Sequence, residues 1–325
     1  MKISLILTGG TIGSRPHEGG LGPDSAAHAE LFARYRKISG DQTEFEICEP
    51  YTILSENLTL AHLEHLTKTV KAVLEKADGV IVTLGTDTLP YTAAALSYTL
   101  GLSSKPVVLV SSNHILSDMR ANGVENFCAA VDFLRGYENA RGVFVSYKNK
   151  GESAGILRAS RLLAHLAPTE AVHTLCGTVA TWDRGQLSPL EYTEKHDELS
   201  PLSAKDLKNA AGRVLFLRAH PDMCYPTLTK QISAVLFESY HSGTLPTATK
   251  ALQDFAGRAK QKGIPIFVAG ITGEATYESA AEYRALSITP LPPISPVAAY
   301  MKLCLATANG LDPQAILPRP LGGDM

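Results

Sequence analysis

The sequence has few cysteines, and they lie far apart along the chain. Five occur among 325 residues, at positions 48, 128, 176, 224 and 304, and no two of them form a Cys-x-x-Cys pair. An odd number of widely spaced cysteines predicts neither a disulfide framework nor a zinc knuckle. We expect buried, reduced thiols, as is typical of the cytoplasm.

The sequence also lacks long apolar segments. No stretch reaches the ~18 apolar residues of a membrane span, and Met1 to Thr8 is too short an apolar run for the core of a secretory signal. With 45% hydrophobic and 19% charged residues, the composition favours a soluble globular protein over a disordered one. We expect a cytoplasmic protein with no membrane partner.

An excess of charge of either sign is missing as well. The chain has 30 Lys+Arg against 32 Asp+Glu, a net charge of −2, and no dense basic run. A protein that neutralises phosphates along a nucleic acid needs such a run, so we expect no nucleic-acid partner. A small neutral or zwitterionic ligand fits this composition better.

Apolar runs alternate with amphipathic stretches, which predicts a doubly wound, mostly parallel α/β sheet. The expected strands are Lys2–Thr8, Val80–Leu84, Val107–Val110, Val143–Tyr147, Val214–Leu217, Ala234–Glu238 and Pro265–Ala269. The expected helices are Leu58–Ala77, Tyr91–Leu100, Asn122–Leu134, Ala248–Lys262 and Pro296–Thr307. A polar, acid-rich stretch predicts a larger N-terminal catalytic domain (1–190), a linker (191–212) and a smaller C-terminal α/β domain (213–325).

Two expected strands end in clusters of glycine, threonine and aspartate. Thr8-Gly9-Gly10-Thr11-Ile12-Gly13 follows the first, and Gly85-Thr86-Asp87-Thr88 follows the second. Glycines let backbone N–H groups approach a ligand or a developing oxyanion, and threonine hydroxyls can act as nucleophiles. The alternative is structural, with threonines forming turns and Asp87 capping a helix. Two such clusters at successive strand ends favour a site.

Other motifs are weaker. The first cluster is similar to a dinucleotide-binding turn of short-chain reductases, but no tyrosine has a lysine four residues later, and no Gly-Lys-Ser/Thr occurs. Gly151-Glu152-Ser153-Ala154-Gly155 matches the Gly-x-Ser-x-Gly elbow of α/β-hydrolases. Because Lys148-Asn149-Lys150 separates it from the preceding strand, a surface hairpin is favoured. An esterase that uses Ser153 stays open as an alternative.

Together, the two clusters resemble the signatures of the bacterial-type L-asparaginase/glutaminase family. The second signature extends over Asp78–Leu89. Ile53-Leu54-Ser55-Glu56-Asn57 is similar to the family's substrate loop, Lys105–Val110 to its third strand, and Val235–Thr244 to the start of its C-terminal domain. The resemblance covers nearly the whole chain and implies the two-domain asparaginase fold.

The resemblance also implies an activity: an amidohydrolase that converts the side-chain amide of asparagine to aspartate and ammonia without metal or cofactor. Thr11 would be the acylated nucleophile, and Thr86 and Asp87 would form a second hydroxyl-centred relay. Ser55 and Glu56, with Asp87, would hold the α-carboxylate and α-amino group. Gly10 and Gly85 would supply N–H donors at the substrate. Family members assemble as homodimers or homotetramers.

Two of the family's helper residues are missing. The glycine-rich stretch after the first signature, which we expect to be a mobile loop, has no tyrosine, and Leu21 occupies its place. The segment Gly155–His165, where the relay lysine falls, contains arginines but no lysine. Arginine stays protonated and cannot serve as a neutral base. A catalytically impaired, amino-acid-binding relative is therefore a second hypothesis.

Overall fold

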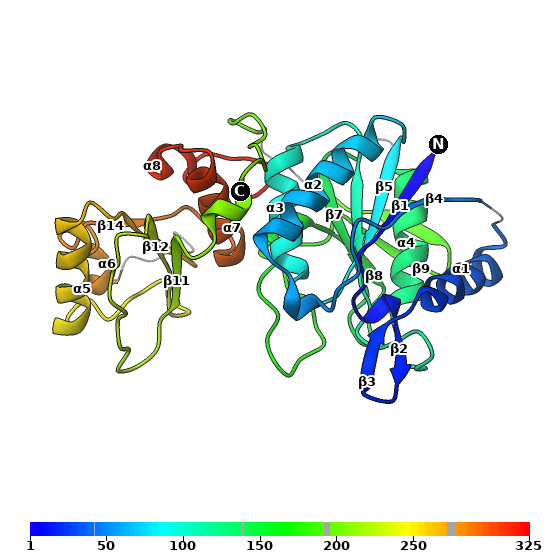
Figure 1. Ribbon diagram of the computed structural model, residues 1–325, viewed down its shortest axis with the longest axis horizontal. Helices are drawn as coiled ribbons and strands as arrows, with labels where there is room; N and C mark the ends of the chain where they lie inside the picture. The colour runs from blue at the N-terminus through cyan, green and yellow to red at the C-terminus, as the bar shows by residue number, and fades with distance from the viewer. Residues whose placement is uncertain (42, 138–139, 192–195, 272–276) are drawn as a thin grey trace.

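The computed structural model describes residues 1–41, 43–137, 140–191, 196–271 and 277–325. Within these ranges the chain forms two helix-flanked sheets, which lie side by side in an elongated molecule (Figure 1). None of the described helices combines the length and apolar character that a membrane span requires.

The larger sheet has eight strands in the order β10-β9-β8-β7-β6-β5-β1-β4. Strands β4, β1, β5, β6 and β7 are parallel, and β8, β9 and β10 continue the sheet in antiparallel fashion. The bounds are β1 (Ile3–Leu7), β4 (Glu46–Cys48), β5 (Gly79–Thr83), β6 (Val107–Val110), β7 (Val143–Tyr147), β8 (Ala154–Arg158), β9 (Ala180–Asp183) and β10 (Gln186–Pro189).

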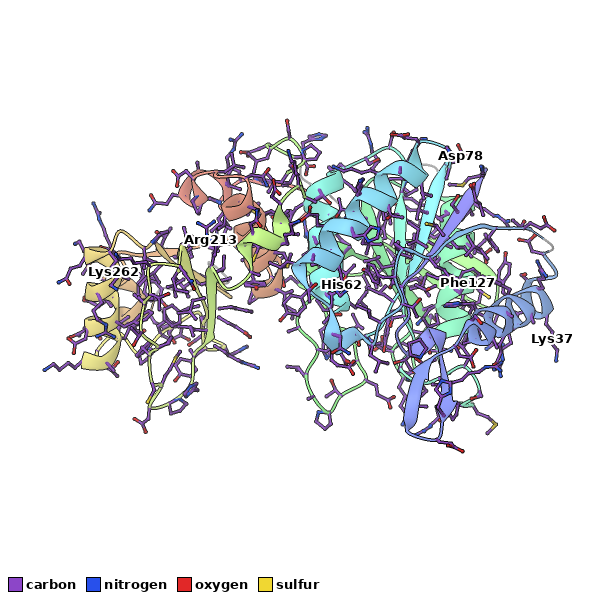
Figure 2. All side chains as sticks on the ribbon, viewed as in Figure 1. Lys37, His62, Asp78, Phe127, Arg213 and Lys262 are labelled. Atoms are coloured by element: carbon purple, nitrogen blue, oxygen red, sulfur yellow. The ribbon has the colours of Figure 1, made fainter. Side chains whose placement is uncertain are left out.

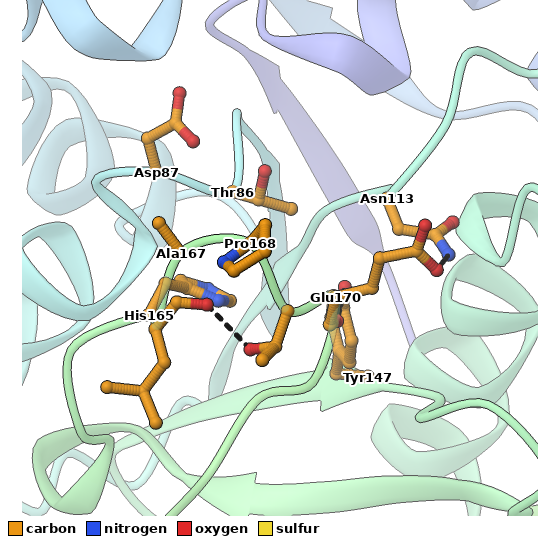
Figure 3. Close-up of a pocket in the computed structure, with 10 residues that line it drawn as sticks. Thr86, Asp87, Asn113, Tyr147, His165, Ala167, Pro168 and Glu170 are labelled. Carbon is orange, nitrogen blue, oxygen red and sulfur yellow. Dashed lines mark hydrogen bonds between the residues drawn. The ribbon is translucent and has the colours of Figure 1, made fainter.

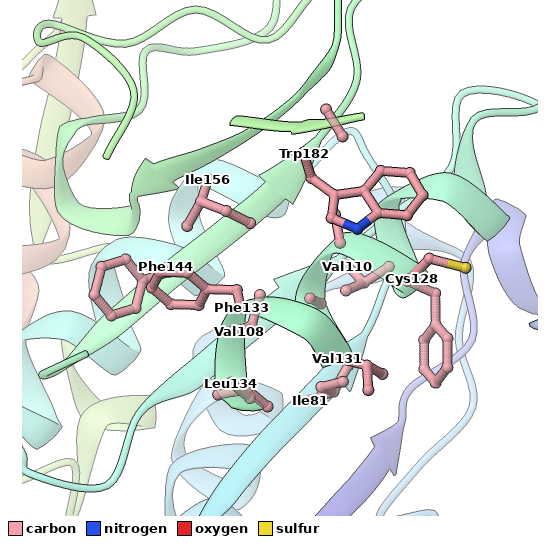
Figure 4. Close-up of a cluster of buried hydrophobic side chains, with 14 of the residues drawn as sticks. Ile81, Val108, Val110, Cys128, Val131, Phe133, Leu134, Phe144, Ile156 and Trp182 are labelled. Atoms are coloured by element: carbon pink, nitrogen blue, oxygen red, sulfur yellow. The ribbon is translucent and has the colours of Figure 1, made fainter. Parts of the chain in front are cut away.

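Helices cover both faces of this sheet. Since neighbouring side chains of a strand point to opposite faces, Leu5 and Leu7 of β1 join one buried cluster and Ile6 joins the other. Helices α1 (Ser25–Ser39) and α4 (Gly123–Gly136) pack on the first face, and α2 (Leu60–Leu74) and α3 (Leu89–Leu100) on the second. Figure 4 shows part of the first cluster, in which Phe144 packs against Phe133 with ring centroids 4.8 Å apart.

The smaller sheet is fully parallel, in the order β11-β12-β13-β14. Its strands are β11 (Val214–Arg218), β12 (Ala234–Glu238), β13 (Ile266–Ala269) and β14 (Ile288–Pro290). Helix α5 (Lys250–Gln261) packs on one face and α7 (Pro296–Ala308) on the other. The remaining helical segments are α6 (Glu278–Ala281), α8 (Pro313–Ile316), η2 (Ser55–Asn57), η3 (Ala159–Arg161) and η4 (Leu207–Ala210).

Helices α3 and α7 join the two parts of the molecule. Ala94 and Ala95 of α3 belong to the same buried cluster as Ala298 and Ala299 of α7, so small side chains let the helices pack closely. Figure 2 shows the exposed Lys37 and Lys262 at opposite outer ends of the molecule, away from this junction. The junction is therefore part of the apolar core.

The predicted fold class is confirmed, and all seven expected strands are present within a few residues of their ranges. Sequence reasoning missed α1, although Asp24 caps its start by accepting from Ala26 N–H at 2.8 Å and Gly40 ends it with φ +70°. The expectation that His17–Ser25 is a loop is wrong. This stretch belongs to a hairpin of β2 (Ser14–His17) and β3 (Gly20–Pro23), which turns at Glu18 and Gly19, and Gly20 starts β3 with φ +131°.

Candidate active site

The two threonine-glycine clusters meet at the carboxyl edge of the larger sheet. β1 and β5 are neighbouring parallel strands with Leu7 opposite Thr83, so the loops that follow them start side by side. Gly10 has φ +74°, and a Cβ atom there would lie 2.1 Å from the backbone nitrogen of Gly85. Glycine tolerates both constraints because it has no Cβ. The fold thus places the two signatures in backbone contact.

Thr11 follows this contact directly, as the first residue of η1 (Thr11–Gly13), and is partly exposed. The Gly13 N–H and the Ser14 hydroxyl both donate to the Gly10 carbonyl, at 3.0 and 2.8 Å, and close the turn. The N–H of Thr11 has no acceptor among the described residues, as is usual at the start of a helix. Thr11 therefore offers both a hydroxyl and an N–H at the strand end.

Ser55 and Asp87 connect the predicted substrate loop to the second signature. The buried Ser55 hydroxyl donates to Oδ2 of the exposed Asp87 carboxylate at 2.8 Å. The Thr88 hydroxyl donates to the Ser55 carbonyl at 3.1 Å, and a Cβ atom on Gly85 would come within 2.4 Å of the Ser55 Cβ. These residues form one packed unit.

The Ser55 loop reaches this position by pairing with the end of β1. Ile53 N–H donates to the Thr8 carbonyl at 3.1 Å, and Gly10 N–H donates to the Ile53 carbonyl at 3.0 Å. The expectation that the Gly10 N–H is available to the substrate is therefore wrong, because that donor is already used. The N–H groups of Thr11 and Thr86 have no acceptor in the described ranges and are better placed to bind an oxyanion.

A cavity of about 410 Å³, the strand-end cavity, opens beside this edge. Thr86 and Asp87 line it, together with Asn113 after β6, Tyr147 at the end of β7 and the segment 165–170 (Figure 3). Its size is within the range of small-ligand pockets. Thr11 lies outside this lining, on the adjoining strand end.

Polar contacts fix one wall of the strand-end cavity. Glu170 Oε1 lies 2.9 Å from His114 Nε2, and Glu170 Oε2 accepts from the Asn113 amide at 3.2 Å. The Tyr147 hydroxyl donates to the backbone carbonyl of Glu170 at 2.9 Å. The pKa of Tyr147 is raised, mainly by burial, so this phenol stays protonated as a donor. The segment 165–170 is thus anchored to the ends of β6 and β7.

Sequence reasoning missed His165, which lines the strand-end cavity with Thr86 and Asp87. Burial lowers the pKa of His165, while the Asp87 carboxylate raises it by a smaller amount. No local motif distinguishes this histidine. Its position depends on how the chain returns to the sheet edge after β8, so the sequence offers only its place at the end of the segment where the relay lysine is expected.

Glu56 is separate from this unit. It is exposed in η2, and among the described residues it forms no hydrogen bond or ion pair with the other predicted site residues. Its role toward the substrate stays a prediction.

The residues found where the family has its helper tyrosine and lysine do not line the strand-end cavity. Leu21 is 54% exposed on β3, opposite Pro16 of the hairpin. Arg158 is buried, lies 4.2 Å from the Phe144 ring centroid and donates to the Arg141 carbonyl at 2.8 Å. Arg161 donates to the Gly323 carbonyl at 2.8 Å. Both arginines therefore have structural contacts.

The esterase alternative is wrong on structural grounds. Ser153 is exposed in the turn between the antiparallel strands β7 and β8, which confirms the predicted hairpin. A nucleophile elbow requires a helix after the turn. Within the described ranges, no group of three or more His, Cys, Asp or Glu side chains is arranged to hold a metal ion.

Comparison with known proteins shows the family and the fold. A family model described as "Asparaginase, N-terminal" matches residues 2–195. L-asparaginase 1 of Escherichia coli (strain K12) is 33% identical over 139 residues, which cover 42% of this chain but only 41% of that protein. A glutamyl-tRNA(Gln) amidotransferase component of Pyrobaculum aerophilum is 26% identical over 331 residues, or 95% of this chain and 75% of that protein.

The fold is also shared. The structure of the thermostable L-asparaginase from Thermococcus kodakarensis superposes with a TM-score of 0.80 and 20% identity, over 100% of this chain and 99% of that one. At this identity the likeness concerns the fold. Since the family model matches more than half of the sequence, the chain belongs to the asparaginase family.

Proposed function

We propose that the protein is an amidohydrolase that hydrolyses the side-chain amide of L-asparagine to L-aspartate and ammonia, with Thr11 as the nucleophile. The observation that carries the proposal is the unit formed by Ser55 and Asp87, 2.8 Å apart, beside the Gly10–Gly85 contact. The segments that contain Thr11, Ser55 and Asp87 are far apart in the sequence, and all three lie at this edge of the sheet.

In this proposal the Thr11 oxygen attacks the amide carbon while its proton passes to a nearby acceptor. A threonine hydroxyl is a weak nucleophile until its proton is removed. The negative charge that develops on the amide oxygen needs N–H donors, and those of Thr11 and Thr86 support this role. Water then hydrolyses the acyl-threonine and restores the hydroxyl.

Recognition of the amino acid would come from a few placed groups. Asp87 and Glu56 are anions suited to the α-ammonium, and the Ser55 region suits the α-carboxylate. Near equality of 30 basic and 32 acidic residues favours a small zwitterion over a tRNA-bound substrate such as the name of the Pyrobaculum relative suggests. The proposed enzyme is cytoplasmic, assembles as a homodimer or homotetramer, and works without a metal or cofactor.

A second candidate is an amino-acid-binding relative with impaired catalysis. It is favoured by the exposed Leu21 at the tyrosine position and by the structural contacts of Arg158 and Arg161. This candidate predicts that aspartate stabilises the protein without turnover.

The test measures ammonia release from L-asparagine, with L-glutamine and D-asparagine as competing substrates. We expect turnover of L-asparagine that Thr11→Ala and Thr86→Ala remove, and that Ser153→Ala, a matched surface change, leaves intact. An inert wild type whose melting temperature rises with aspartate supports the binding protein. An inert wild type without that rise contradicts both candidates.

A further inference from the structure

One imidazole in the strand-end cavity has a nitrogen without a partner. The Nε2 atom of His165 is shielded from solvent and has no hydrogen-bond partner among the described residues. Leaving a buried polar atom unpaired costs about 1–3 kcal/mol. Such an atom next to candidate reactive groups indicates a partner that forms at another stage. Figure 3 shows His165, Thr86 and Asp87 around the same cavity.

The other side of the ring is held by the backbone. Burial has the largest effect on the pKa of His165 and lowers it. Asp87 raises this pKa, His173 lowers it, and a hydrogen bond to the backbone of Ala171 raises it by the smallest amount. Because Nε2 is unpartnered, this bond belongs to Nδ1, which carries the ring proton when it donates to a carbonyl. Neutral His165 therefore has a lone pair on Nε2.

The surrounding charges favour this neutral form. Burial is the largest effect and keeps the pKa of His165 below 6.5, although Asp87 opposes it. Glu170, the other carboxylate on the cavity wall, lies 2.9 Å from His114 and is not among the groups that shift the pKa of His165. At neutral pH, His165 is thus in the state that accepts a proton.

We propose that His165 is the proton acceptor for the Thr86 hydroxyl, the task for which the family's relay uses a lysine. This inference rests on the proposed amidohydrolase function. Neither Arg158 at the end of β8 nor Arg161 in η3 can act as a neutral base in this role.

Thr11 transfers its proton to the Thr86 oxygen as its own oxygen bonds to the amide carbon, and Thr86 passes its original proton to His165 Nε2, through one water or after its hydroxyl moves within hydrogen-bond distance. The carbon–nitrogen bond then breaks, and the leaving nitrogen takes this proton and departs as ammonia. In the second half, water gives one proton to His165 as its oxygen attacks the acyl carbon, and the proton returns to Thr11 when the ester bond breaks.

The decisive variant is His165→Asn, because the asparagine amide can keep the donor to Ala171 while it removes the basic nitrogen. We expect kcat for L-asparagine to fall about 10²–10⁴-fold, with KM largely unchanged. The wild-type kcat should show an acid limb with its midpoint below 6.5, the ordinary value for histidine, and the variant should lack this limb. Imidazole added to His165→Ala should restore part of the rate.

His241→Asn is the matched control, since His241 is exposed, does not line the strand-end cavity and is not among the groups that shift the pKa of His165. Its kcat should stay near that of the wild type. Melting temperatures of all variants separate lost activity from lost folding. An active, folded His165→Asn enzyme with the wild-type acid limb would overturn the role of His165 and leave the amidohydrolase function standing. An inert wild type would overturn both.

Discussion

Gly10 and Gly85 touch through their backbones, and a Cβ atom on Gly10 would lie 2.1 Å from the Gly85 nitrogen. This contact joins the ends of β1 and β5 and fixes the positions of Thr11 and Thr86, which follow the two glycines directly. The site therefore depends on two residues that have no side chain.

We predict that Gly10→Ala destabilises the protein by at least about 2 kcal/mol, since it combines a strained positive φ with a backbone clash. Urea denaturation measures the change. Gly257→Ala is the control, because Gly257 is exposed in α5 with nothing near its Cβ position. It should stabilise the protein by about 0.5–1 kcal/mol. A Gly10→Ala protein as stable as the wild type would contradict the described contact.

Loss of the Ser55 hydroxyl should weaken substrate binding. Ser55 Oγ donates to Asp87 at 2.8 Å, and a hydrogen bond to a charged group contributes about 1.5–3 kcal/mol. We expect Ser55→Ala to raise KM for L-asparagine by roughly tenfold or more. Steady-state kinetics check this, with Ser153→Ala as the surface control. An unchanged KM would show that Ser55 does not position the binding carboxylate.

Stability should fall in mild acid because of His28. This side chain is 7% exposed beneath Gly13, and burial lowers its pKa, while Glu49 raises it by less. In the unfolded chain His28 binds a proton near pH 6.5, before the folded protein does. The contribution of His28 to the free energy of unfolding is therefore fully present above pH 6.5. It decreases as the pH falls toward the lowered pKa of His28 in the folded protein.

Urea denaturation across this pH range tests the effect. His28→Gln should flatten the acid-side decrease, whereas His241→Gln, at an exposed position, should leave it unchanged. Parallel pH curves for the wild type and His28→Gln would assign the decrease to other groups.

The C-terminal segment should depend on a buried ion pair. Lys302 of α7 and Asp324 are both fully buried at the side chain and lie 2.8 Å apart, and the Tyr98 hydroxyl donates to the same carboxylate at 3.0 Å. Lys302→Met leaves a buried carboxylate without its cation and should cost about 3–5 kcal/mol.

Adding Asp324→Asn removes the stranded charge and should recover much of this loss, because the amide still accepts hydrogen bonds through its oxygen. A double-mutant cycle in urea measures the recovery. Additive losses from the two substitutions would contradict a coupled pair.

The sequence by itself determined the elements that carry strong periodic patterns. Val107–Val110, Val143–Tyr147 and Ala234–Glu238 coincide with β6, β7 and β12 because buried parallel strands form continuous apolar runs. It also marked the clusters around Thr11 and Thr86 as a candidate site, because two glycine-threonine clusters follow successive strands. Short or polar elements such as β9 and the β2–β3 hairpin lack such patterns and were not predicted.

Only the tertiary structure decided which side chains lie together and which hydrogen-bond donors already have a partner. The Gly10 N–H looked available in sequence, yet it pairs with the Ile53 carbonyl in the fold. His165 had no sequence signal, yet it lines the cavity with Thr86 because the chain after β8 returns to the same sheet edge. Local patterns reflect burial along one segment, whereas hydrogen-bond partners and pKa shifts depend on residues distant in sequence.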